Sequence, residues 1–459
     1  MIHDNVWKTY SEADVEQVEK LSAGYIDFLS SSKTERECTE SIVAMAEKNG
    51  YRNLNEVIAN GEKLEKGSKV YAVNMGKTVM TLNIGEDIIR DGMNILGAHI
   101  DSPRLDLKQN PLYESDELAY LNTHYYGGIK KYQYVAMPLA LHGVIAKTDG
   151  TTVTINIGEK DDDPVFFVSD LLIHLAQDQL QKVAAKVIEG EDLDIMIGTK
   201  PLKGEEKDAV KAFVLEILKK EYDIEEDDFW SAEIEAVPAG RCREAGFDRS
   251  LILGYGHDDR CCAYPSSVAI FDLPELKTTS CGLFVDKEEI GSVGATGMES
   301  HFFEDTMREV LDRMGIYSEL NLTRVLRRSR MLSSDVSAAF DPLYADKFEK
   351  MNAAKINHGL VFNKYTGSRG KGGSNDANAE YLGRIRAMMD KHNVAYQSAE
   401  LGKVDVGGGG TIAYILSLYG MEVVDSGVPV LSMHAPWEAI SKADLYEAYK
   451  GYKAFLTEG

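Results

Sequence analysis

The sequence predicts an α/β fold in which helices cover both faces of a mainly parallel sheet, with a β-rich domain inserted into the chain. Three observations lead to this prediction. Apolar strand patterns alternate with amphipathic helix patterns near both ends of the chain, as in sheets whose parallel strands are joined by helices. Short strand patterns dominate the middle of the sequence instead. The 459 residues are enough for two or three domains, each with its own core.

The acidic composition narrows the possible partners. The formal net charge is −24 and the pI is about 4.9, whereas nucleic acids and anionic membrane surfaces attract clustered Lys and Arg. No apolar run approaches the roughly 18 residues of a membrane span, and residues 1–5 lack a signal-peptide pattern. We therefore expect no nucleic-acid partner and no membrane partner.

Cysteine usage points to a reducing compartment. The chain has five cysteines, an odd and scattered set without a Cys-x-x-Cys pair: Cys38, Cys242, Cys261, Cys262 and Cys281. Such a set is not a disulfide framework and does not indicate a zinc ribbon. A cytoplasmic location is the simplest expectation.

The first α/β part covers residues 1–103. Its patterns predict two helices, at 12–29 and 35–49, followed by strands at 69–74, 78–84 and 94–100. Thr34 and Glu37 form a capping box that begins the second helix. The last strand ends in His99 and Asp101, whose side chains share a face because strand residues two positions apart do so.

The inserted domain covers residues 104–244. It contains a predicted hairpin, 143–148 and 151–158, turning at Asp149-Gly150, and a helix near 209–220. The α/β pattern then resumes over 245–459. There we predict a helix after His257, a strand at 281–285, a strand at 428–433, and helices near 303–314, 320–328, 377–391, 412–418 and 443–456.

Two adjacent glutamates, Glu288 and Glu289, follow the apolar strand 281–285. Neighbouring residues of a strand point to opposite faces, so both carboxylates can reach one site only where the chain turns. Gly291 permits that turn. Two such carboxylates suit different tasks, one holding a metal and the other moving a proton. The alternative is a solvated pair in a loop.

Four further positions, which with Glu289 make five candidate ligands, favour the metal interpretation. His99, Asp258, Glu289, Asp335 and His434 are nitrogen and oxygen ligands at the ends of different segments. One zinc needs three protein ligands and an open position. Five ligands therefore fit two metals if one carboxylate bridges them, and Glu288 is then left to act as general base. Taken singly, a strand-end histidine can be a core residue, and Asp258 or Asp335 can be a helix N-cap.

These residues stand in ordered motifs that resemble the aspartyl aminopeptidase (aminopeptidase I) family of dinuclear zinc metallopeptidases. The motifs cover essentially the whole chain: 99–104 (HIDSPR), 258–260 (DDR), 286–292 (DKEEIGS), Ser334-Asp335 and 432–436 (SMHAP). The resemblance implies a zinc-peptidase-like catalytic domain that hydrolyses the N-terminal residue of peptides.

The resemblance also implies individual roles. One zinc would be held by His99, Asp258 and Asp335, and the other by Asp258, Glu289 and His434, so that Asp258 is the bridge. Glu288 matches the general base of the family, and Asp101 matches the residue that orients the ligand histidine. Co²⁺ or Mn²⁺ could replace Zn²⁺.

The same resemblance implies an assembly. In the family the insert mediates dimerisation, and dimers build closed tetrahedral dodecamers. The segment 171–175 (LLIHL) resembles a family motif whose histidine, here His174, reaches the active site of a neighbouring subunit. On an amphipathic helix, where we expect it, such a histidine taken by itself is more often a packing residue.

Two other functions compete with an aminopeptidase. One is a dinuclear amidase or deblocking peptidase, and the other is a non-catalytic shell or scaffold protein of the same fold. A scaffold should have lost at least one of the site residues, and none is lost here.

Substrate preference depends on segment 363–371, which has three cations, Lys364, Arg369 and Lys371, and no acid. A cation facing the pocket would favour peptides with an acidic first residue. The alternatives are that these cations balance acidic neighbours or subunit contacts, or that the acid-reading lysine of the family corresponds to Asn363 and not to Lys364. The family also includes enzymes that prefer apolar first residues.

Overall fold

The computed structural model describes residues 4–273, 277–367 and 369–459, and these divide into two compact units. Unit 1 comprises residues 1–101, 242–433 and 438–459. Unit 2 comprises 102–241 together with 434–437. The sequence placed the borders of the insert at 103/104 and 244/245. No helix in the described part of the chain is both long and apolar enough to cross a membrane.

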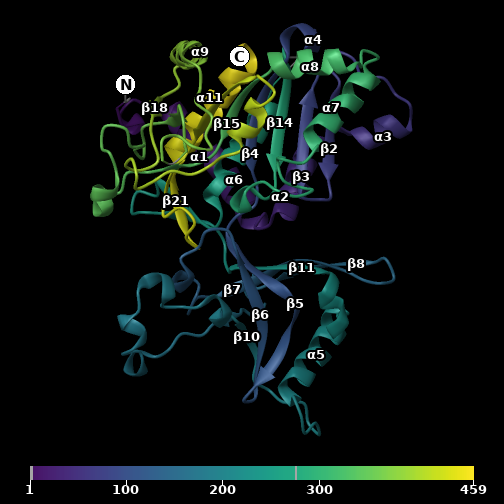
Figure 1. Ribbon diagram of the computed structural model, residues 1–459, viewed down its shortest axis with the longest axis vertical. Helices are drawn as coiled ribbons and strands as arrows, with labels where there is room; N and C mark the ends of the chain where they lie inside the picture. The colour runs from purple at the N-terminus through teal and green to yellow at the C-terminus, as the bar shows by residue number, and fades with distance from the viewer. Residues whose placement is uncertain (1–3, 274–276, 368) are drawn as a thin grey trace. The chain divides into compact units, whose positions relative to one another are not determined.

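Unit 1 is built on a nine-stranded sheet with strand order β1-β2-β3-β14-β4-β15-β19-β17-β18 (Figure 1). The pairs β1–β2, β14–β4, β4–β15, β15–β19 and β17–β18 are parallel, and the remaining three pairs are antiparallel. The strands are β1 (Arg52–Asn53), β2 (Lys69–Asn74), β3 (Thr78–Asn83), β4 (Met93–His99), β14 (Thr279–Val285), β15 (Arg330–Ser334), β17 (Leu360–Asn363), β18 (Tyr396–Ser398) and β19 (Glu422–Gly427).

Helices cover both faces of this sheet, because its central strands are apolar on both sides. In β4, Leu96 and Ala98 belong to one core cluster, whereas Met93 and Ile95 belong to another. The first cluster includes side chains of α1 (Glu12–Ser31), α2 (Glu35–Lys48), α6 (His257–Phe271), α9 (Ala379–Lys391) and α11 (Lys442–Glu458). The second includes α3 (Leu54–Ala59), α4 (Ile88–Asp91), α7 (Phe302–Arg313), α8 (Glu319–Arg328) and α10 (Ala413–Ser417). The predicted α/β class is confirmed.

Local signals set the helix ends as expected. The side chain of Thr34 accepts the backbone N–H of Glu37, whose carboxylate in turn accepts the N–H of Thr34, so the predicted capping box is present. Unit 1 also contains a five-stranded sheet that the sequence did not predict. Its order is β12 (Arg243–Ala245), β13 (Leu251–Gly254), β21 (Glu438–Ser441), β20 (Pro429–Leu431) and β16 (Ser337–Ala338).

Unit 2 contains a seven-stranded sheet and one longer helix, α5 (Ala209–Tyr222). Its strand order is β8 (Thr152–Ile157), β7 (Leu139–Ala146), β11 (Ala232–Pro238), β5 (Arg104–Ser115), β6 (Leu118–Tyr126), β10 (Ile195–Gly198) and β9 (Phe167–Val168). Helix α5 contacts β5, β6 and β10 (Figure 1). The hairpin across Asp149-Gly150 joins β7 and β8 as predicted.

The segment around His174 corrects one expectation. We predicted an amphipathic helix, but Ile173–Leu175 forms a single 3-10 turn, and the three residues are exposed. The apolar neighbours that suggested a buried helix face are themselves exposed, Leu172 by 54% and Leu175 by 68%. Apolar residues at helical spacing form a helix only where a partner surface covers them, and in the single chain these side chains have little cover.

Candidate metal centre

The candidate site lies at the carboxyl ends of three neighbouring parallel strands. Strand β4 lies between β14 and β15, and its terminal His99 is opposite Val285, the last residue of β14. On the other side Ser333 of β15 is opposite Gly97. Since parallel strands end at the same edge of a sheet, this register brings His99, the Glu288-Glu289 turn and Asp335 to one place.

Asp101 connects His99 to the two glutamates. Its carboxylate accepts the backbone N–H of Glu288 at 3.1 Å and that of Glu289 at 3.2 Å. The Nδ1 of His99 lies 3.0 Å from the main-chain oxygen of Asp101 and 3.3 Å from its carboxylate. The turn uses positive φ values at Lys287 (70°) and Gly291 (94°), the turn that the sequence predicted at Gly291. Asp101 is fully buried, so its contacts with His99 and with the backbone of the two glutamates are shielded from water.

The other ring nitrogen of His99 faces acids. Nε2 lies 3.0 Å from Oδ1 of Asp258 and 3.9 Å from Oε2 of Glu288. Ligand atoms of His99, Asp258 and Asp335 all lie within 4.8 Å of one another, and so do those of His99, Glu288 and Glu289. Asp335 follows a strand and no helix begins there, so its alternative role as a helix N-cap is wrong.

The electrostatics of this cluster call for a cation. Burial raises the pKa of Asp335 well above its ordinary value, and repulsion from Glu288 and Asp258 raises it further. Burial lowers the pKa of His99, but its bonds to Asp101 and Asp258 outweigh that effect and leave the pKa raised. In both residues the raised pKa favours the protonated form, which reduces the excess negative charge. A divalent metal bound by the same atoms would neutralise that charge, so the residues fit a metal.

His434 and His174 are residues of unit 2, whereas the other candidate residues belong to unit 1. The Nδ1 of His434 lies 2.9 Å from the carbonyl oxygen of Gly128. Donation to that carbonyl places the proton on Nδ1 and the lone pair on Nε2, as in a metal-binding histidine. The ligand role of His434 and the catalytic role of His174 stay predictions.

Two supporting residues were not predicted. Glu438, the buried first residue of β21, accepts the backbone N–H of Asp258 at 3.1 Å. The buried guanidinium of Arg260 donates to the carbonyls of Ile100 and Lys33. Arg260 belongs to the motif 258–260 named in the sequence analysis, so a cation next to two acids could have indicated this supporting role. Nothing in the sequence marks Glu438, which is 180 positions from its partner.

Two of the three cations of segment 363–371 are paired with an acid outside that segment. The ammonium groups of Lys364 and Lys371 lie 3.3 Å and 2.9 Å from the carboxylate of Asp376. The amide of Asn363 is buried and donates to Ser337 at 2.8 Å.

Comparisons with known proteins relate almost the whole chain to one family. The family model of the aminopeptidase I zinc metalloproteases (M18) matches residues 28–456. A probable M18 family aminopeptidase 1 of Clostridium acetobutylicum is 57% identical, over 99% of this chain and 98% of the relative. A probable M18 family aminopeptidase 1 of Thermotoga maritima is 44% identical over 99% of each chain.

Solved structures show the same fold. An M18 aminopeptidase from Thermotoga maritima superimposes with a TM-score of 0.95 at 43% identity, and the match covers 100% of both chains. Aminopeptidase I from Clostridium acetobutylicum gives a TM-score of 0.93 at 55% identity, with 99% of both chains covered. These similarities confirm the predicted fold class.

Proposed function

Because the chain belongs to the M18 (aminopeptidase I) family of zinc metalloproteases, we propose that it uses a dinuclear zinc centre with Glu288 as general base. The family identifies the chain as a zinc aminopeptidase, a hydrolase that removes N-terminal residues. The number of metal ions, their ligands and the residue that moves the proton are our inference.

The cluster of acids around His99 is the observation that supports this proposal most directly. His99, Asp258 and Asp335 would hold one zinc, and Asp258, Glu289 and His434 the other. The first three have ligand atoms within 4.8 Å of one another, and Asp258 offers a second carboxylate oxygen for the bridge. Bound zinc would polarise the scissile carbonyl and lower the pKa of a water ligand.

Glu288 is suited to move the proton. Its carboxylate lies 3.9 Å from His99 Nε2, and its side chain is 16% exposed, so it borders the cluster and still reaches solvent. Asp101 holds its backbone in place through the N–H bond described above. In the proposed mechanism Glu288 accepts a proton from the attacking water and later donates it to the leaving amine.

The proposed substrates are peptides with a free N-terminus. A site surrounded by carboxylates attracts an α-ammonium group, which would limit cleavage to the first residue. We further propose a preference for an acidic first residue, with Lys364 as the selecting cation. The salt bridge to Asp376 competes with that role, since a substrate carboxylate would have to replace a resident one.

The proposed assembly is a homo-oligomer, a tetrahedral dodecamer built from dimers. The S. cerevisiae mApe1 dodecamer shares the fold, with a TM-score of 0.76 at 17% identity. Exposed apolar side chains of unit 2, among them Ile173, Leu175 and Leu180, are suited to burial between subunits. The five cysteines are free and buried, which agrees with the cytoplasmic location proposed from the sequence.

Glu288→Gln and Glu289→Gln together test the proposed roles. We expect Glu288→Gln to keep two zinc ions per subunit by elemental analysis and to lose at least about 10²–10⁴-fold in kcat on aminoacyl anilides. The matched Glu289→Gln variant should lose one zinc. If Glu288→Gln binds less zinc and Glu289→Gln retains it, the two roles are exchanged. If the wild-type protein loaded with zinc cleaves no aminoacyl substrate, it is a scaffold instead.

A further inference from the structure

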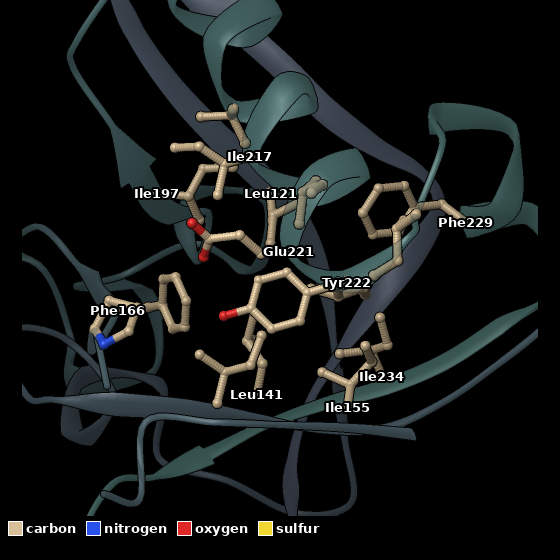
Figure 2. A pocket seen from close by; sticks show the side chains of 16 residues that line it. Leu121, Leu141, Ile155, Phe166, Ile197, Ile217, Glu221, Tyr222, Phe229 and Ile234 are labelled. Carbon is tan, nitrogen blue, oxygen red and sulfur yellow. The ribbon is translucent and has the colours of Figure 1, made fainter. Parts of the chain in front are cut away.

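Unit 2 contains an apolar cavity that the aminopeptidase reaction does not use. Its volume is about 230 Å³, and it lies between helix α5 and the seven-stranded sheet (Figure 2). The sheet contributes mostly aliphatic side chains, including Leu121, Leu141, Ile155 and Ile234, and the helix contributes Val214 and Ile217. A designed cavity of about 150 Å³ with similar walls admits benzene, so this space is large enough for a small organic molecule.

The cavity persists because α5 does not close on the sheet. Only Val210, near the start of the helix, is buried, whereas Val214 and Leu218 are half-buried although they pack against the apolar cluster of unit 2. Apolar walls without contacting atoms lose dispersion energy, and such a cavity does not hold water well. A ligand with an apolar body would restore those contacts.

One end of the cavity is polar and negatively charged. Figure 2 shows the Glu221 carboxylate and the Tyr222 hydroxyl on the same side of the cavity as the ring of Phe166. Burial raises the pKa of the Tyr222 phenol, and the carboxylates of Glu221 and Asp163 raise it further, so both acids act on this end. Tyr222 is also the last residue of α5, where the helix dipole is negative.

No cation lines this end of the cavity among the residues that the structure describes. On the same helix, the ammonium group of Lys219 is paired with Asp223 and Glu225 at 2.8 Å and 2.9 Å. An anionic head group would therefore meet repulsion from Glu221 and from the helix terminus. A cationic head group would be attracted by both, and the aromatic faces of Tyr222 and Phe166 can add cation–π stabilisation.

We propose that this cavity is a binding site for a small amphiphile that carries an ammonium head on an apolar body, such as a primary alkylamine or arylalkylamine. The body occupies the space between α5 and the sheet, and the ammonium group lies at the end formed by Glu221 and Tyr222. The site is built only from residues of unit 2, so it is independent of the metal centre and of the proposed function.

Calorimetric titration of the full-length protein with n-octylamine, n-octanol and n-octanoate tests the proposal. We expect saturable binding of octylamine, about tenfold tighter than octanoate, because Glu221 attracts one head group and repels the other. Octanol should fall between them. If octylamine does not bind saturably, the proposed site is wrong. This outcome includes the case in which a second subunit fills the cavity in the assembly. Equal affinity for the three probes would overturn the head-group assignment.

Two variants and one control variant localise the binding. Glu221→Gln should remove the preference for octylamine over octanoate, whereas Glu216→Gln, on the same helix but outside the cavity lining, should leave it unchanged. Ile217→Phe should fill the cavity and weaken all three probes. If Glu221→Gln keeps the wild-type preference, or if Ile217→Phe folds and binds octylamine as the wild type does, the amine binds elsewhere and the assignment is wrong.

Discussion

At the scale of residues, Asp258 is the carboxylate that we propose as the bridge between two zinc ions. Asp258 lies 3.0 Å from His99, and its backbone N–H is held by Glu438. Only a bridging ligand serves both ions, so Asp258→Ala should lose both zinc ions, whereas Asp335→Ala should lose mainly one. Elemental analysis after equilibrium dialysis measures this. Loss of one zinc in each variant would contradict the bridge.

Asp101 is a positioning residue in this scheme, since it contacts a ligand histidine and the backbone of both glutamates. Asp101→Ala should weaken zinc binding and lower kcat, each by about 10–100-fold. Asp101→Asn retains one acceptor oxygen and should recover part of both losses. A variant with normal zinc affinity and normal kcat would show that the turn holds without this carboxylate.

Substrate selection also depends on single residues. Lys364 and Lys371 both form salt bridges with Asp376. We expect the wild type to have a higher kcat/KM for aspartyl and glutamyl substrates than for leucyl ones. Lys364→Met should lower the ratio of kcat/KM for acidic substrates to kcat/KM for leucyl substrates about tenfold. Asp376→Asn should raise this ratio by releasing the ammonium group of Lys364. Lys371→Met is the matched control. A leucyl preference in the wild type, or equal effects of the two lysine variants, would exclude Lys364 as the selector.

At the scale of elements, strand β19 contains a buried acid, Asp425, whose carboxylate accepts the hydroxyl of Thr411 at 2.5 Å. Burial raises its pKa to about 7. The folded state therefore binds a proton between about pH 4 and 7 that the unfolded state has lost, so this residue makes stability fall as pH rises through that range.

Asp425→Asn mimics the protonated form. We expect its unfolding free energy to fall less than that of the wild type between pH 5 and pH 8. The variant should therefore become more stable relative to the wild type as pH rises. Urea denaturation at several pH values measures the difference. Parallel pH profiles for the two proteins would show that Asp425 does not titrate in this range.

At the scale of the whole molecule, unit 2 should drive assembly. We expect the full-length protein to form one large particle by size-exclusion chromatography with light scattering. Deletion of 104–244 should give smaller particles with little activity. His174→Ala should keep the particle size and lower kcat if this histidine reaches a neighbouring site. A fully active monomer would refute the assembly, and a His174→Ala variant with normal kcat would refute only the catalytic role.

Local patterns in the sequence were sufficient for much of the fold. The capping box of Thr34 and Glu37, the strand that ends at His99 and the turn after Val285 depend on residues a few positions apart. Periodicity and capping act over such distances, so they can be read without knowing the partners. The same patterns put acids and histidines at segment ends, so a grouping of acids around His99 could be expected from the sequence, and their role as metal ligands stays a prediction.

Contacts between distant residues were decided only by the tertiary structure. Strand β14 lies between β3 and β4, far from both in sequence, and this insertion brings Glu288 beside His99. The support of Asp258 by Glu438 and the pairing of Lys364 with Asp376 follow from packing as well. At His174 the apolar spacing predicted a helix, but the chain forms a 3-10 turn because no surface of its own covers those side chains. Burial depends on which surfaces meet, and that information is not contained in any single stretch of the chain.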